Sequence, residues 1–96
     1  MLERTFTIKG RLGLHARAAA KLVRLTTSFQ SQLSLRRVDG DVTADAKSIL
    51  SVLMLAANQG TELRAVADGV DEEAAMTAID ELFAAGFGEL ESESSI

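Results

Sequence analysis

The stretch Gly13-Leu14-His15-Ala16-Arg17-Ala18 contains the only histidine of the 96-residue chain and decides how the residues around it fold. Gly10 and Gly13 interrupt an extended segment, and apolar residues then recur at the three- and four-residue spacing of an amphipathic helix. We therefore expect His15 at the beginning of a helix. The first N–H groups of a helix have no acceptor within it, so this position favours an anion such as phosphate.

Apolar side chains occupy even positions before this stretch, and polar side chains separate them, which predicts a half-buried strand over residues 3–9. After the stretch, a helix of about 13 residues is expected from Ala16, with basic residues outside its apolar stripe. The stripe consists of Ala19, Leu22, Val23 and Thr26, with Phe29 as its last candidate member.

Two strands and a helix are expected in the middle of the chain. Leu33 and Leu35 alternate with polar residues, and Val38-Asp39-Gly40-Asp41-Val42 has the Asp-Gly pair of a β-hairpin leading to a short strand at about 42–45. The apolar run Ile49 to Ala57 is too short to cross a bilayer and predicts a helix capped by Asp45 or Ser48. Such a helix leaves part of its apolar surface exposed as a contact patch.

The last third of the chain is expected to form a strand and a helix. Asn58-Gln59-Gly60 ends the preceding helix, and residues 61–67 alternate as a strand. Asp71 begins a final helix with favourable negative charge in its first turn, and the glycine-rich segment 86–88 ends it. Residues 89–96 are acidic and Ser-rich and are expected to fray. The predicted core stripe of the final helix is Ala75, Ala78, Ile79, Leu82 and Phe83.

These elements follow the order strand, helix, strand, strand, helix, strand, helix. The hairpin requires an antiparallel pair, and three helices of this length cover only one face of a sheet. We predict an α+β domain over residues 1–88, followed by a tail over residues 89–96. The domain is expected to be a two-layer open-faced β-sandwich, with a four-stranded antiparallel sheet covered on one face by three helices (βαββαβα).

Composition excludes several classes of function. The net charge is −4, with eight Lys or Arg in residues 1–40 and nine Asp or Glu in residues 65–96, which argues against nucleic acid as a partner. The basic first half instead fits an acidic protein or a single phosphoryl group. One histidine and no cysteine provide no metal-ligand cluster and no disulfide, and no cofactor is expected. The sequence has no membrane-spanning run or signal peptide, so we expect a cytoplasmic protein without membrane contact.

Several segments resemble the HPr family, the histidine-containing phosphocarriers of the bacterial phosphoenolpyruvate-dependent phosphotransferase system. The resemblance covers about residues 3–88 and keeps the family's order of elements. The segments are Gly13-Leu14-His15-Ala16-Arg17, Lys47-Ser48-Ile49-Leu50, Val52-Leu53-Met54-Leu55 before Asn58-Gln59-Gly60, and Leu82-Phe83-Ala84-Ala85-Gly86-Phe87-Gly88. The last of these segments is similar to the corresponding segment of family members from the nitrogen-related regulatory branch of the system. The alternative is the sugar-transporting branch.

The resemblance implies a stoichiometric phosphoryl carrier rather than a free-standing enzyme. His15 would accept a phosphoryl group on Nδ1 from enzyme I and pass it to an A component of the system. Arg17 would help to hold the group, and the backbone N–H groups of Ala16 and Arg17 would bind its oxygens. Ala18 stands where the family usually has proline, so we expect a looser helix start with intact chemistry. Gly10 replaces a polar loop residue of many relatives and is expected to loosen the loop.

Ser48 matches a serine that an HPr kinase/phosphorylase modifies in many family members. A serine before a helix is also a common N-cap, so the regulatory and capping interpretations both stay open. We expect a monomer with one surface for its partners, although the basic residues also fit an ordinary solvated face and the apolar ones a core. This surface consists of Ala16, Ala20, Lys21, Arg24, Ile49, Leu50, Leu53 and Met54.

A second hypothesis belongs to another functional class. The chain would be a regulatory α+β domain that binds a protein or a small ligand without phosphoryl transfer, and His15 would serve only as a helix cap. Uptake of acid-labile phosphate by His15 from enzyme I separates the two hypotheses.

Overall fold

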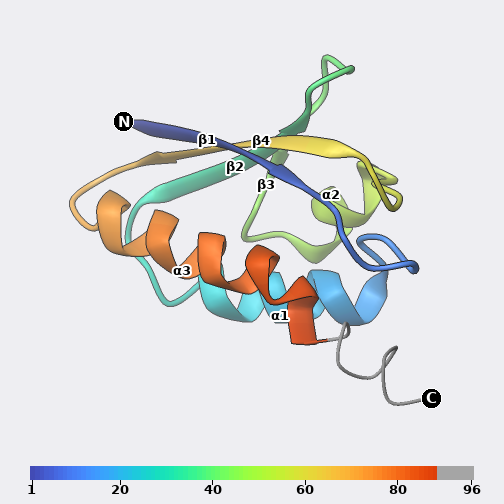
Figure 1. Ribbon diagram of the computed structural model, residues 1–96. Coiled ribbons are helices and arrows are strands. Elements are labelled where there is room, and N and C mark those ends of the chain that lie inside the picture. The colour runs from blue at the N-terminus through green and yellow to red at the C-terminus, as the bar shows by residue number, and fades with distance from the viewer. Residues whose placement is uncertain (89–96) are drawn as a thin grey trace.

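The computed structural model describes residues 1–88 and confirms the predicted α+β fold. A four-stranded antiparallel sheet with the strand order β1-β4-β2-β3 carries three helices on one face (Figure 1). The elements are β1 (Leu2–Thr7), α1 (Ala16–Thr26), β2 (Gln32–Arg37), β3 (Thr43–Asp45), α2 (Ile49–Met54), β4 (Glu62–Asp68), α3 (Glu72–Ala84) and the short 3-10 turn η1 (Gly86–Gly88). The predicted tail, 89–96, lies outside the described residues.

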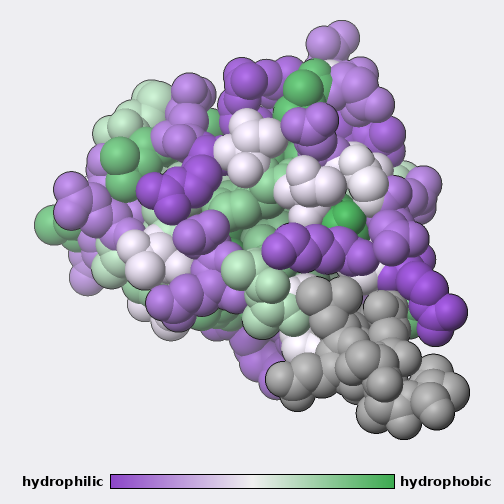
Figure 2. Space-filling view, viewed as in Figure 1, coloured by the Kyte–Doolittle hydropathy of each residue, from purple (hydrophilic) through white to green (hydrophobic). Residues whose placement is uncertain are grey.

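Alternating side chains on the strands divide the sheet into a buried face and an open face. Leu33 and Leu35 on β2 point into the core, as do Leu63, Ala65 and Ala67 on β4. The residues between them are half-buried or exposed, so the sheet packs on the helices with one side only. Hydrophilic residues cover most of the side shown in Figure 2, and apolar residues reach its surface in separate patches.

The predicted hairpin joins β2 to β3. Ser34 pairs with Asp45, and Leu35 pairs with Ala44, across a connection formed by residues 38–42. Cross-strand pairing places Ala44 in the core beside Leu35, which fixes the register of the hairpin. β2 also pairs with β4, which places the two middle strands in the centre of the sheet.

Three phenylalanines close the core beneath β1. The rings of Phe6 and Phe83 stack with centroids 4.7 Å apart, and Phe87 meets Phe83 edge-on at 4.9 Å. The predicted stripe of α3 was partly wrong, because Met76 is buried whereas Ala78 and Leu82 are only half-buried. The buried face is therefore rotated toward Met76 relative to the prediction.

Two helices are shorter than predicted. α1 has 11 residues rather than about 13, and α2 ends at Met54 rather than Ala57. Ala56 is the first left-handed residue after α2 (φ 50°), and Gly60 of the predicted segment 58–60 is left-handed as well (φ 88°). The guanidinium of Arg37 donates to the carbonyls of Leu55 and Ala56 and so satisfies acceptors that the helix end leaves without partners.

Asp71 precedes α3, but its carboxylate does not cap that helix. It accepts hydrogen bonds from the amides of Gln30 (2.8 Å) and Ser31 (2.9 Å) and from the buried Ser31 hydroxyl, and so fastens the loop between α1 and β2. The Ser31 hydroxyl, followed by the Gln30 amide, lowers the pKa of the Asp71 carboxyl because each donor favours the charged form. Asp71 thus joins the start of α3 to the segment that enters β2.

Candidate functional site at the beginning of α1

His15 is the N-cap of α1, as predicted from the spacing around it. Its backbone is extended (φ −78°, ψ −178°), and its carbonyl accepts the first helical hydrogen bond from Ala19 at 2.8 Å. The half-buried imidazole turns back toward the helix, where Nδ1 accepts a hydrogen bond from the Arg17 amide at 3.3 Å. In the neutral ring this bond requires the lone pair on Nδ1 and the proton on Nε2.

The loop before His15 lies directly on the segment after α2. The Leu14 amide donates to the Ala57 carbonyl at 2.8 Å, and the Leu14 side chain is buried. Gly13 has a left-handed backbone (φ +65°), and a Cβ on it would lie 2.5 Å from the Ala57 oxygen. Only glycine fits this position, and the approach sets the direction in which the chain reaches His15.

Gly10 in this loop and Ala18 in the first turn of α1 are the two positions at which the sequence departs from the family's usual residues. A Cβ on Gly10 would meet nothing within 4 Å, and the Gly10 carbonyl accepts a hydrogen bond from the Gly13 amide at 3.1 Å. Ala18, which replaces the family's proline, lies fully buried in the first turn of α1. The helix still begins at Ala16 with His15 as its cap, so alanine at position 18 is compatible with this helix start, and the looser start expected without proline stays a prediction.

Three basic residues lie along α1, and no acidic residue lies in its first turn. Arg17 and Arg24 are exposed, and within residues 1–88 the Arg17 guanidinium makes no hydrogen bond or ion pair. Lys21 is half-buried instead, and its Nζ donates to the Phe87 carbonyl at 2.6 Å. The structure thus leaves two of the three predicted basic residues accessible and fastens the third to η1.

Apolar side chains remain exposed on α2, which packs beside α1. Leu50 is 71% exposed and Met54 is 79% exposed, whereas Ile49 is 39% exposed and Leu53 is half-buried. A six-residue helix cannot turn every apolar side chain inward, and Val52 together with Leu55, the residue after the helix, already fills the buried side. We call the predicted group the α2 apolar patch; it comprises Ala16, Ala20, Ile49, Leu50, Leu53 and Met54.

Sequence reasoning missed one apolar residue of this region, Leu12. It is 67% exposed and lies three residues before His15. Leu12 fits neither the alternating pattern of the strand before it nor the three- and four-residue spacing of the helix after it. This lack of fit was the only signal in the sequence that Leu12 stays outside the core. Leu12 therefore extends the apolar surface near His15 beyond the predicted set.

Ser48 is the N-cap of α2, which decides between the two predicted caps. Its Oγ accepts a hydrogen bond from the Ser51 amide at 3.4 Å, and the residue is half-buried. The Asp45 carboxylate instead accepts from the Lys47 amide at 2.9 Å, just before the helix. The capping interpretation of Ser48 is confirmed, and its regulatory role stays a prediction.

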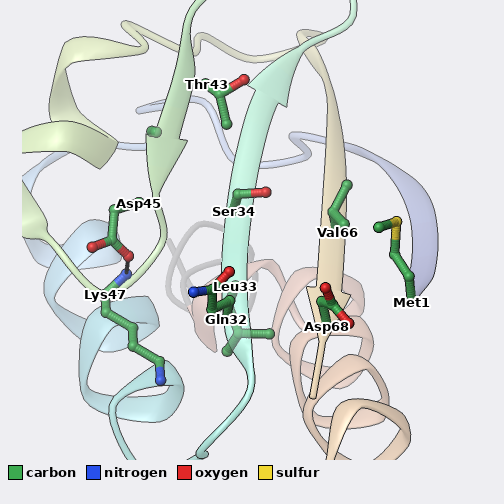
Figure 3. A pocket seen from close by; sticks show the side chains of 10 residues that line it. Met1, Gln32, Leu33, Ser34, Thr43, Asp45, Lys47, Val66 and Asp68 are labelled. Atoms are coloured by element: carbon green, nitrogen blue, oxygen red, sulfur yellow. Dashed lines mark hydrogen bonds between the residues drawn. The ribbon is translucent and has the colours of Figure 1, made fainter.

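Two hollows in the surface lie away from His15. One is on the open face of the sheet, between Ser34, Val66 and Asp45 (Figure 3). The second lies beside the turn at residues 58–62. Neither includes His15 or Arg17. Within residues 1–88, no three metal-binding side chains gather and no helix is long and apolar enough to cross a membrane.

Residues 2–85 match the family described as the PTS HPr component phosphorylation site. A phosphocarrier protein HPr of Xylella fastidiosa is 49% identical over 89 residues, which are 93% of this chain and 98% of that protein. The chain belongs to the HPr family.

Other members of the HPr family agree with this assignment. A phosphocarrier protein NPr of Proteus mirabilis is 46% identical over 86 residues, which cover 90% of this chain and 94% of that protein. The crystal structure of HPr-C-His from Thermoanaerobacter tengcongensis superposes with a TM-score of 0.86 at 38% identity, covering 93% of this chain and 98% of that one. Similarity therefore extends over both sequence and fold, and it includes relatives named HPr and relatives named NPr.

Proposed function

We propose that this chain is a phosphoryl carrier of the phosphotransferase system, with His15 as its acceptor. The observation that carries the proposal is the hydrogen bond between His15 Nδ1 and the Arg17 amide, because it holds a nucleophilic lone pair at the beginning of α1. A phosphoryl group on Nδ1 would arrive where the helix presents unpaired N–H donors. Membership of the HPr family supports this reading.

The transfer needs no external base. The Nδ1 lone pair forms the new bond to phosphorus while the bond from phosphorus to its donor atom on enzyme I breaks, and Nε2 keeps its proton. The amides of Ala16 and Arg17 then donate to the phosphoryl oxygens, and the Arg17 guanidinium adds a charge-assisted bond. The helix dipole contributes about 0.3 to 1 kcal/mol at such a site. Modest stabilisation suits a carrier, since a firmly held group would not be handed on.

The α2 apolar patch provides the surface on which enzyme I and the A component take turns. It spans α2 and the adjoining part of α1, and exposed Arg17 and Arg24 on α1 add positive charge. Apolar side chains supply contact area, and the arginines steer acidic partners to it. We place this exchange in the cytoplasm. Because relatives of similar identity carry both names, HPr and NPr, the sugar-transporting and nitrogen-related branches stay alternatives.

Ser48 is proposed as a regulatory site for an HPr kinase/phosphorylase. Its hydroxyl makes only a long cap bond, 3.4 Å from the Ser51 amide, and Leu50 of the α2 apolar patch follows two residues later. Phosphate there would place negative charge within the proposed docking surface. Acid-stable phosphate that His15→Ala retains and Ser48→Ala loses would identify the site; kinase treatment that labels both variants equally would exclude it.

Purified enzyme I with labelled phosphoenolpyruvate tests the carrier. The parent chain should gain acid-labile phosphate, His15→Ala should gain none, and Arg17→Ala should be labelled on the order of tenfold more slowly because it loses a charge-assisted bond. Arg64→Ala removes the same charge from β4 and should react like the parent. Equal labelling of His15→Ala and the parent contradicts His15 as the acceptor. Absence of labelling in the parent contradicts the carrier itself and leaves the non-transferring regulatory domain as the explanation.

A further inference from the structure

Arg37, the last residue of β2, holds the carbonyl end of α2. Its Nη1 donates to the carbonyls of Ala56 at 3.0 Å and Leu55 at 3.3 Å. Its Nε and Nη2 meanwhile donate to the two carboxylate oxygens of Asp39, at 2.9 Å and 3.2 Å. These bonds lower the pKa of Asp39 and raise that of Arg37, so both groups stay charged. The planar guanidinium can serve both sides at once because its donors point in fixed directions.

The carbonyl end of α2 is joined directly to the loop before His15. Ala57 follows Ala56, and its carbonyl accepts the Leu14 amide at 2.8 Å. A Cβ on Gly13 would lie only 2.5 Å from the oxygen of this carbonyl. The two backbones are therefore in direct contact, with no side chain between them. A shift at Ala56 therefore reaches the residue before His15 across one peptide unit and one hydrogen bond.

Further bonds fasten only the earlier part of this loop. The Gly60 amide donates to the Ile8 carbonyl at 2.9 Å, and Gln59 Nε2 donates to the Lys9 carbonyl at 3.0 Å. Both contacts lie five or more residues before His15. Among the described residues, the Leu14–Ala57 bond is the nearest backbone hydrogen bond that ties this loop to another segment, and the carbonyl of Ala56, next to its acceptor residue, is held by Arg37.

We propose that Arg37 is a positioning residue for His15. Its guanidinium fixes the backbone of Leu55 and Ala56, and through Ala57 it fixes the Leu14 amide and the direction in which the imidazole meets the Arg17 amide. The inference rests on the proposed function only where it concerns the rate of phosphoryl transfer. The effect of Arg37 on the position of His15 and on its hydrogen bond to the Arg17 amide does not depend on the proposed function.

Arg37→Gln tests the inference, with two controls chosen from the chain. Arg36→Gln removes the same charge from the adjacent residue, whose guanidinium, within residues 1–88, donates only to the Gly40 carbonyl in the hairpin. Ser31→Ala weakens the loop that Asp71 fastens, far along the chain from His15, and so controls for a general loss of stability. Thermal unfolding of all three variants shows whether they fold and how their stabilities compare.

Two nuclear magnetic resonance measurements report on the position of the backbone around His15 without any phosphoryl transfer. In Arg37→Gln, the Leu14 amide should exchange with solvent on the order of tenfold faster, because its acceptor is no longer fixed. The Arg17 amide resonance should shift as its bond to Nδ1 changes, while both controls should keep the parent values. Unchanged Leu14 exchange and an unchanged Arg17 resonance in Arg37→Gln would overturn the inference.

The transfer assay adds a third readout. With enzyme I, the maximal rate of Arg37→Gln should fall about threefold to tenfold, since small displacements of a reacting group are costly. The enzyme I concentration at half-maximal rate should change less than about twofold, because the docking residues are kept. Equal slowing by Ser31→Ala would assign the effect to stability and overturn the inference. Absence of labelling in the parent would contradict the proposed function instead and leave the two amide readouts valid.

Discussion

Ala56 is the residue with the most unfavourable local conformation on the path to His15. Its φ of 50° lies in the left-handed region, although the side chain is exposed and gains no packing there. An L-residue in this region is disfavoured by about 1–2 kcal/mol, whereas glycine is tolerated but loses more entropy on folding. The chain accepts the strain because Arg37 and Leu14 hold the carbonyls on both sides of the bend.

Ala56→Gly should therefore stabilise the protein by about 0.5–1 kcal/mol. Chemical denaturation with urea measures the change in the free energy of unfolding. Ala74→Gly makes the same substitution at an exposed position within α3, where it should destabilise by about 0.5–1 kcal/mol because glycine is a poor helix former. Destabilisation by both variants would show that the bend at Ala56 is not strained.

At the residue scale, the sequence predicted the position of His15 at the beginning of a helix, because two local signals coincide there. Gly13 carries a conformation that only glycine adopts readily, and the helical spacing starts immediately after it. Arg37 had no such signal, since an arginine at a strand end is ordinary and its partners lie 18 and 19 residues away. A contact set by tertiary structure leaves no periodicity in the sequence.

At the element scale, α2 shows that a hydropathy pattern does not predict where a helix ends. The run of apolar residues from Ile49 to Ala57 predicted nine helical residues, but the helix has six. Leu55 and Ala57 are buried after the helix ends, so apolar character continues while the backbone conformation changes. Hydropathy reports burial and does not distinguish a helix from the irregular segment that follows it.

The short length of α2 leaves Leu50 exposed, and Leu50→Ser tests whether this exposure serves docking. The enzyme I concentration at half-maximal transfer rate should rise on the order of threefold to tenfold, as for an apolar contact residue at an interface. Stability should change by less than about 0.5 kcal/mol because the side chain is already in solvent. Val70→Ser, at an 86% exposed position before α3, is the matched control and should transfer like the parent. Equal behaviour of the two variants would remove Leu50 from the docking surface.

At the scale of the whole molecule, the layers were predictable and the ties between distant segments were not. The alternating pattern of the strands, the helical spacing of the apolar residues and one hairpin signal were sufficient to predict a four-stranded sheet covered by three helices. Asp71 was expected to act on its own helix, yet it binds Gln30 and Ser31, some 40 residues earlier. Only the packed fold brings the start of α3 to the entry of β2, so this role was invisible in the sequence.

The hydrogen bonds that Asp71 accepts from Gln30 and Ser31 make the free energy of unfolding depend on pH. In the folded chain, donors from Ser31 and Gln30 lower the pKa of Asp71, whereas in the unfolded chain the carboxyl has its ordinary pKa of about 4. Its contribution is therefore complete above about pH 4 and is lost as the pH falls through the folded value. The parent's melting temperature should decline below about pH 4, with Glu72 adding to the decline because its pKa is also lowered.

Asp71→Asn isolates the share of Asp71 in this pH dependence. Its melting temperature should lie below that of the parent near pH 7, because an amide oxygen is a weaker acceptor than a carboxylate and its NH₂ group cannot accept. The gap should narrow toward about pH 3, where protonation removes the same charge from the parent. Asp41→Asn, at an exposed position between β2 and β3, should follow the parent curve throughout. A gap of constant size from pH 7 to pH 3 would show that the Asp71 charge does not hold the loop between α1 and β2 in place.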